Sequence, residues 1–250
     1  PGPPPWPRGA PSPVPLPHDL TSTIVWIRLA AVAAAGLTLV TVTHRAAESD
    51  AVTPTQVADG AVIHPGPAPA ARPPIPLRPT GDGHLLVPHA RPAVGTGSET
   101  TYTVEVDPAL RDQATALSQA VTAALDDTTH GWAASVRLRQ VVDPDTASIR
   151  ILLAEPAVVD GLCAHAGYAT NGQYSCWNGR FAALNSLRWF DGADGFASIQ
   201  QYRRYQINHE FGHGLGHAHE YCAGPGQLAP VMMQQSKGLL GCRPNPYPSR

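Results

Sequence analysis

A strong charge of either sign is missing from this chain of 250 residues, whose formal net charge is −2 at pH 7. That balance provides no general electrostatic basis for binding nucleic acid or an anionic membrane surface, so we predict no nucleic-acid partner. Lysine is almost absent: Lys237 stands against sixteen arginines among the 17 basic residues. This ratio reflects genome base composition more readily than chemistry, and it predicts no function.

Cysteine is scarce, and its spacing argues against a cysteine-based metal site. The four cysteines are Cys163, Cys176, Cys222 and Cys242, and no two of them form a C-x-x-C pair. An even count predicts two disulfides formed in an oxidising compartment. Of the three pairings, Cys163–Cys176 and Cys222–Cys242 close the shortest loops and are preferred. Buried free thiols are the alternative.

The first third of the chain lacks the composition of a folded core, because nineteen of the 27 prolines fall within residues 1–92. Proline interrupts helices and sheet ladders, so such sequence buries little surface. We predict a proline-rich segment over residues 1–23, a proline-rich disordered linker over 44–95, and one compact, monomeric domain over 96–250.

Between the proline-rich segments, residues 24–43 are almost entirely apolar. The nineteen residues from Ile24 to Val42, rising about 1.5 Å each, would span the ~30 Å hydrocarbon core of a bilayer. Arg28 lies close enough to one end to reach the interface. We predict a single-pass cell-membrane anchor with the N-terminus inside and the domain extracytoplasmic. A cleaved signal peptide, which would make the domain secreted, is the alternative.

The most informative feature is the sequence HEFGHGLGHAH at residues 209–219, which matches H-E-x-x-H-x-x-G-x-x-H. On a helix, His209 and His213 project from one face, so both imidazoles can bind one metal ion. Glu210 lies about 100° further round, where it can contact a water without being a ligand. Gly216 lets the chain leave the helix, and His219 can return as the third ligand. Three protein ligands leave the fourth tetrahedral position open, which predicts a catalytic zinc site.

A second histidine competes for the third position. His217 lies four residues beyond His213 and would share its face if the helix continued. Gly214 and Gly216 oppose this continuation, since glycine costs about 1 kcal/mol relative to alanine in a helix interior. We therefore prefer His219. The alternative for the whole segment is a solvated, charged helix that binds no metal.

Hydrophobic periodicity predicts the elements around this segment. Alternation predicts strands over residues 101–106, 136–141 and 149–153, and two short strands over 175–177 and 180–187 around an Asn178-Gly179 turn. Apolar residues at helical spacing predict helices over 109–126, 157–162 and 197–214.

The motif resembles that of the metzincin zinc metallopeptidases. The resemblance implies an α+β domain in which a twisted mixed sheet backs the active-site helix, and the order of the predicted elements agrees with it. It also implies a methionine-containing turn beneath the metal. Met232, which directly follows Pro230 and Val231, is the preferred residue, and Met233 is the alternative.

The chain is also similar to the DUF3152 family of actinobacterial proteins over about residues 96–248. Besides the motif, the similarity rests on Cys222, Gly224-Pro225-Gly226, Ala229-Pro230-Val231-Met232, Gln234-Gln235 and Gly241-Cys242. It implies a metal site of the metallopeptidase type and names no substrate.

Together these features predict a zinc metallopeptidase, membrane-anchored or secreted, that hydrolyses peptide or protein outside the cytoplasm. His209, His213 and His219 would hold Zn²⁺, and Glu210 would be the general base. Two alternatives are a zinc-stabilised, non-catalytic module that binds the cell surface or wall, and a hydrolase of a non-peptide or cell-wall amide.

Oxyanion stabilisation and alignment of the peptide are two further roles for which the sequence offers candidates but no single residue. Tyr168, Tyr174 or Tyr221 could assist the oxyanion, because glutamines stand where some metzincins carry a tyrosine after the methionine turn. The strand around residues 181–187, expected at an edge of the sheet, would align an extended peptide by strand addition.

Overall fold

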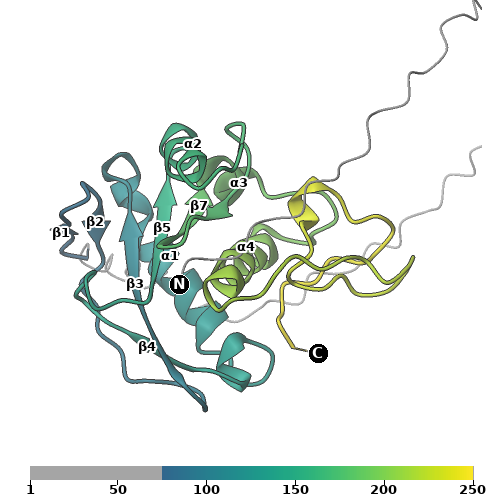
Figure 1. Ribbon diagram of the computed structural model, residues 1–250, viewed down its shortest axis with the longest axis horizontal. Coiled ribbons are helices and arrows are strands. Elements are labelled where there is room, and N and C mark those ends of the chain that lie inside the picture. The colour runs from purple at the N-terminus through teal and green to yellow at the C-terminus, as the bar shows by residue number, and fades with distance from the viewer. Residues whose placement is uncertain (1–74, 250) are drawn as a thin grey trace, which may run out of the picture. The chain divides into compact units, whose positions relative to one another are not determined.

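The computed structural model describes residues 75–249, which form an α+β fold built on a twisted mixed sheet (Figure 1). The strands are β1 (Arg78–Pro79), β2 (Leu85–Leu86), β3 (Glu99–Val106), β4 (Arg137–Gln140), β5 (Ile149–Ala154), β6 (Cys176–Trp177) and β7 (Phe181–Asn185). The α-helices are α1 (Ala114–Leu125), α2 (Pro156–Ala164), α3 (Ser186–Asp191) and α4 (Ile199–Gly214). Short 3₁₀ helices are η1 (Pro108–Gln113), η2 (Trp132–Ala134) and η3 (Gln235–Lys237).

The sheet runs in the order β1-β2-β3-β5-β7-β6, and β4 pairs with the first half of β3. Strand β3 pairs in parallel with β4 and β5, and β5 pairs in parallel with β7. Strand β2 is antiparallel to β3, and β6 is antiparallel to β7. Parallel neighbours require crossovers, and α1 and α2 lie in those connections.

Helices cover both faces of the sheet, so its central strands are buried on both sides. On one face, alternate residues such as Val104, Ile151 and Leu184 join α1 and α4 in the main core. On the other face, Leu152 and Ala183 pack with α2. All six residues of β5 are buried, as expected of a central strand between two helical layers.

The polar side of β3 is buried rather than solvated. Its alternation predicts a strand with one wet face, yet Thr103 and Glu105 are fully buried. Arg150, which is 1% exposed, donates from Nε to Glu105 Oε1 at 2.7 Å and also pairs with Asp82. The buried carboxylate is therefore neutralised inside the sheet layer.

The predicted linker extends too far. Residues 75–95, assigned to it, belong to the folded domain: β2 pairs with β3, Val87 is fully buried, and Val94 bridges to Leu138. Proline is tolerated there because Pro79 lies in an edge strand, where one row of backbone groups needs no sheet partner. The predictions for residues 1–23, for the apolar segment 24–43 and for residues 44–74 concern parts of the chain outside the described residues.

The prediction that residues 181–187 form an edge strand is wrong. Strand β7 lies between β5 and β6, so it has no free edge. It ends at Asn185, whose side chain accepts a hydrogen bond from Leu187 N at 2.9 Å and caps α3. The sheet edge on this side is β6.

Helix α4 carries the first half of the sequence motif, and its middle turns are buried. Ser198 caps its first turn by accepting from Gln201 N. Every residue from 205 to 212 is buried between the sheet and the segment that follows the helix. That segment is fastened to α4, since Asn208 Nδ2 donates to Pro246 O at 2.8 Å. The helix therefore presents its last turns in a fixed position.

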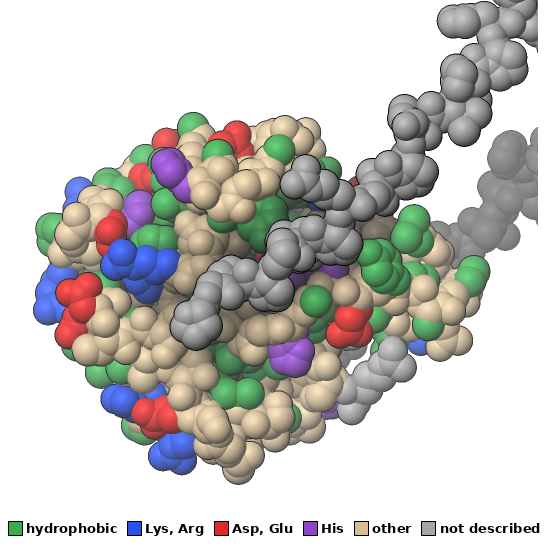
Figure 2. Space-filling model, viewed as in Figure 1, with side chains coloured by type: hydrophobic (Ala, Val, Ile, Leu, Met, Phe, Trp, Pro, Cys, Tyr) green, Lys and Arg blue, Asp and Glu red, His purple; other side chains and the backbone are tan. Residues whose placement is uncertain are grey.

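Within residues 75–249, no helix has the length and apolar character needed to cross a membrane. Acidic and basic side chains are interspersed on the face shown in Figure 2, which carries no broad patch of one sign.

Candidate metal centre

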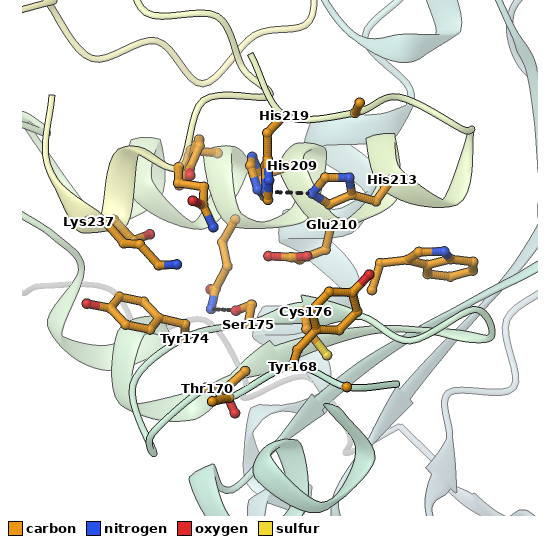
Figure 3. Close-up of a pocket in the computed structure, with 18 residues that line it drawn as sticks. Tyr168, Thr170, Tyr174, Ser175, Cys176, His209, Glu210, His213, His219 and Lys237 are labelled. Carbon is orange, nitrogen blue, oxygen red and sulfur yellow. Dashed lines mark hydrogen bonds between the residues drawn. The ribbon is translucent and has the colours of Figure 1, made fainter. Parts of the chain in front are cut away.

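Three histidines converge at the C-terminal end of α4 (Figure 3). His209 and His213 project from the helix, His219 returns from the segment beyond it, and one ring nitrogen of each lies within 4.8 Å of the others. The Nε2 atoms of His213 and His219 are 3.1 Å apart. Two nitrogens on one tetrahedral zinc, each bonded at about 2.0–2.1 Å, would be about 3.3 Å apart. The pair is therefore spaced as zinc ligands are.

Backbone carbonyls orient two of these rings. His209 Nδ1 lies 2.9 Å from Val231 O, and His213 Nδ1 lies 2.8 Å from His217 O. A carbonyl can only accept, so each Nδ1 carries the proton and donates it. Nε2 is then left with the lone pair that a metal requires.

The histidines are held in the neutral form that binds metal. Burial lowers the pKa of His209 to about 3, and it also lowers the pKa values of His213 and His219. Proton competition for these nitrogens is therefore weak near neutral pH. Within residues 75–249, this is the only cluster of three or more histidine, cysteine or carboxylate side chains with such spacing.

His217 lies elsewhere. Its ring stacks on Trp132, with centroids 4.5 Å apart, and its carbonyl is the acceptor for His213. The cause is Gly216, which has φ of +94°, a left-handed conformation that turns the chain out of the helix after Gly214. The structure thus brings His219, and not His217, to the other two histidines.

Met232 lies beneath the histidines. A Cβ built on Gly212 would be 2.5 Å from Met232 Sδ, so the sulfur packs directly against helix backbone between His209 and His213. Met233 instead belongs to a small cluster with Ala229 and Cys242. Of the two methionines, Met232 therefore occupies the place expected for the turn under a metal.

Both preferred disulfides are present. Cys163–Cys176 joins α2 to β6, and Cys222–Cys242 joins the chain just beyond His219 to the segment beyond the methionine turn. The second bridge acts with the hydrogen bond from Glu220 N to Met232 O, at 3.1 Å, to fix the segment that carries His219.

Glu210 lies beside the histidines at a cavity of about 460 Å³ that all four side chains line. It is 6% exposed, and no described residue donates a hydrogen bond to its carboxylate. Burial raises its pKa to about 8, against an opposing effect of Lys237. A carboxylate so placed is a stronger base than an exposed one, which suits proton transfer near neutral pH.

One family profile, described as "Protein of unknown function (DUF3152)", matches residues 75–241. The chain belongs to the DUF3152 family. The match takes in the sheet, α4, all three histidines and the Met232 turn, and it starts where the described domain starts. No curated protein and no solved structure matches the chain.

One wall of the cavity in this DUF3152 protein is the loop of residues 165–175 between α2 and β6. Asp160 holds the loop by accepting from Thr170 Oγ1 and from Gly172 N, the latter at 2.9 Å. Two of the three candidate tyrosines, Tyr168 and Tyr174, line the cavity from this loop. The third, Tyr221, is 81% exposed and lies outside it.

Sequence reasoning missed several residues of the DUF3152 site. Trp132 packs against Gly212, and its Nε1 donates to Asn208 O at 3.0 Å, so it supports α4 from 76 residues away. No local pattern marks it. Lys237 lines the cavity as well, and its only signal was being the sole lysine.

Histidine substitutions should separate the two candidate third ligands of this DUF3152 protein. We expect the purified chain to hold about one equivalent of zinc, His213→Ala and His219→Ala to lose most of it, and His217→Ala to keep it. The reason is that His217 stacks on Trp132 while the other two face each other. Elemental analysis of zinc per chain measures the outcome.

His217→Ala is the matched control, because it removes an imidazole from the same segment. Retention of the full equivalent by His213→Ala would contradict the ligand set. Loss in His217→Ala with retention in His219→Ala would show that the third ligand is wrong.

Proposed function

We propose that this DUF3152 protein is a zinc-dependent, metzincin-like peptidase that hydrolyses peptide bonds outside the cytoplasm. The observation that carries the proposal is the convergence of three neutral imidazoles beside a buried carboxylate to which no described residue donates. A structural zinc site has four protein ligands and no use for such a base.

Zinc held by three histidines would supply a Lewis acid that acidifies a coordinated water and polarises a carbonyl. Glu210 Oε accepts the proton of the attacking water and later delivers it to the nitrogen of the leaving amine. Val231 O and His217 O keep the ligand rings oriented meanwhile. Tyr168 and Tyr174 border the cavity, and their hydroxyl groups are the candidates to assist the oxyanion.

Strand β6 supports a peptide as substrate. Cys176 and Trp177 pair with β7 on one side only, and both residues line the cavity. The free side of an edge strand offers backbone donors and acceptors to an extended chain. A peptide laid along β6 would pass Glu210 and the histidines.

The extracytoplasmic location is supported by the two disulfides, since such bridges persist in oxidising compartments. We retain residues 24–43 as the proposed anchor or signal segment.

A substrate screen tests this function. The zinc-loaded full chain is incubated with casein and, separately, with purified peptidoglycan, and soluble products are identified by mass spectrometry. We expect new peptide termini from casein, lost with a chelator and restored by zinc.

The other outcomes discriminate between the alternatives. Release of products from peptidoglycan alone would favour a cell-wall amide as the substrate. No product from either, at one equivalent of zinc, would favour the non-catalytic binding module.

A further inference from the structure

Lys237 lies at one end of the cavity and is unlike the rest of its lining. Figure 3 shows Lys237 beside Tyr174, on the other side of Glu210 from His213 and Tyr168. Its Nζ is 5.1 Å from the centre of the Tyr174 ring. Apart from the histidines, Lys237 is the only basic side chain in the lining, and Glu210 is the only carboxylate.

The lysine is presented from a braced segment. Helix η3 is tied to α4 by two tyrosines: Tyr202 Oη lies 2.8 Å from Ser236 Oγ, and Tyr205 Oη accepts from Gln235 N at 2.8 Å. Gln235 Nε2 also donates to Pro230 O, at 3.1 Å. The Cα end of the Lys237 side chain is therefore fixed relative to His209 and His213, which lie on α4.

The ammonium group has no anionic partner in the described part of the chain. No ion pair there includes Lys237, although its charge acts on Glu210, His209 and His219. The only carboxylate in the lining is Glu210. A cation in a cavity favours an occupant that brings a negative group.

We propose that Lys237 is a specificity-determining residue that selects substrates carrying a carboxylate on the Tyr174 side of the cleaved bond. The inference rests on the proposed function and names the substrate class for that same site. Two sources supply this chemistry: an aspartate or glutamate side chain, and the free α-carboxylate of a peptide that ends near the cleaved bond.

Cleavage profiling tests the proposal with the zinc-loaded full chain and a mixed peptide library. We expect the cleavage sites of the native protein to be enriched about tenfold in a carboxylate at one subsite, the size of one charge-assisted hydrogen bond. Lys237→Gln should lose the enrichment, Lys237→Glu should reverse it, and Lys237→Arg should restore it. Blocking peptide C-termini as amides separates the sources, since only selection for the α-carboxylate disappears.

Arg111→Gln is the matched control, because it removes one positive charge from an exposed residue outside the cavity. It should leave the enrichment intact. Native cleavage without any carboxylate preference would overturn the role of Lys237 while leaving the peptidase function standing. An enrichment that persists in Lys237→Gln would do the same.

A binding measurement covers the case in which the native protein cleaves nothing. Pairs of peptide hydroxamates that differ only in aspartate versus asparagine are titrated against the zinc-loaded chain. We expect about tenfold tighter binding of the aspartate member by the native protein and equal binding by Lys237→Gln. Equal binding by the native protein would overturn the inference, whereas the absence of cleavage would count against the proposed function alone.

Discussion

Glu210→Gln is expected to leave the protein folded and zinc-loaded but to lower its hydrolytic rate by about 10²–10⁴-fold, the usual contribution of general-base catalysis. Glutamine has nearly the size of glutamate, so the packing of α4 is kept. The amide cannot take a proton from water, and Glu210 is not among the three converging ligands. The measurement is kcat/KM on any peptide that the native chain cleaves, with zinc content determined in parallel.

The parallel zinc determination is what makes this substitution decisive. A fall in rate together with loss of zinc would mean that Glu210 supports the metal centre rather than the chemistry. Native rate with full zinc would show that hydrolysis proceeds without Glu210 as its base. Zinc should also be released in acid as the ligand histidines take up protons, and their lowered pKa values should confine that release to pH values below about 6.5. The rate should begin to fall at higher pH than the zinc content, because burial raises the pKa of Glu210 to about 8 and the protonated carboxyl cannot act as the base.

Arg150→Ala is expected to destabilise the fold by about 3–5 kcal/mol, the usual cost of breaking a buried ion pair by removing one partner. Arg150 and Glu105 are 1% and 0% exposed, and the substitution would leave the Glu105 carboxylate buried without its cation. Thr103 Oγ1 donates to that carboxylate at 2.7 Å but carries no charge. Urea unfolding followed by tryptophan fluorescence gives the free energy of unfolding.

The double variant Arg150→Met with Glu105→Leu is the control. It removes both charges and puts apolar volume in their place, so its stability should be close to that of the native chain. If the double variant were as unstable as Arg150→Ala, packing rather than the unpaired charge would explain the loss. A cost below about 1 kcal/mol for Arg150→Ala would contradict burial of an uncompensated charge.

Much of the sheet and of α4 could be predicted because their patterns are local. Strand β5 is apolar apart from Arg150, β3 alternates, and the apolar periodicity before His209 marks α4. The i, i+4 spacing of His209 and His213 likewise fixes their common face, and the positive φ of Gly216 agrees with the early end of the helix.

The remaining elements depend on partners far away in sequence. The two-residue strands β1 and β2 form because β2 pairs with β3 and β1 pairs with β2. The local sequence is rich in proline and gives no strand pattern, so it predicted a linker instead. Whether β7 lies at an edge depends on where β6 folds back, which no periodicity encodes. The buried pair of Glu105 and Arg150 turned an apparently solvated strand face into an interior one.

The same limit applies to the candidate site. The histidines could be found from one contiguous segment of the sequence. Lys237, Trp132 and the two cavity tyrosines come from separate segments that only tertiary packing brings together. Their arrangement reflects the disulfides, the 165–175 loop and the bracing of η3, none of which a local pattern specifies.

The most direct test of the central claim is diffraction at the zinc absorption edge from crystals of the zinc-loaded chain. We expect one anomalous peak at about 2.0–2.1 Å from Nε2 of His209, His213 and His219, with a fourth ligand that is not protein and that faces Glu210. A peak elsewhere, His217 in place of His219, or a fourth protein ligand closing the site would contradict it.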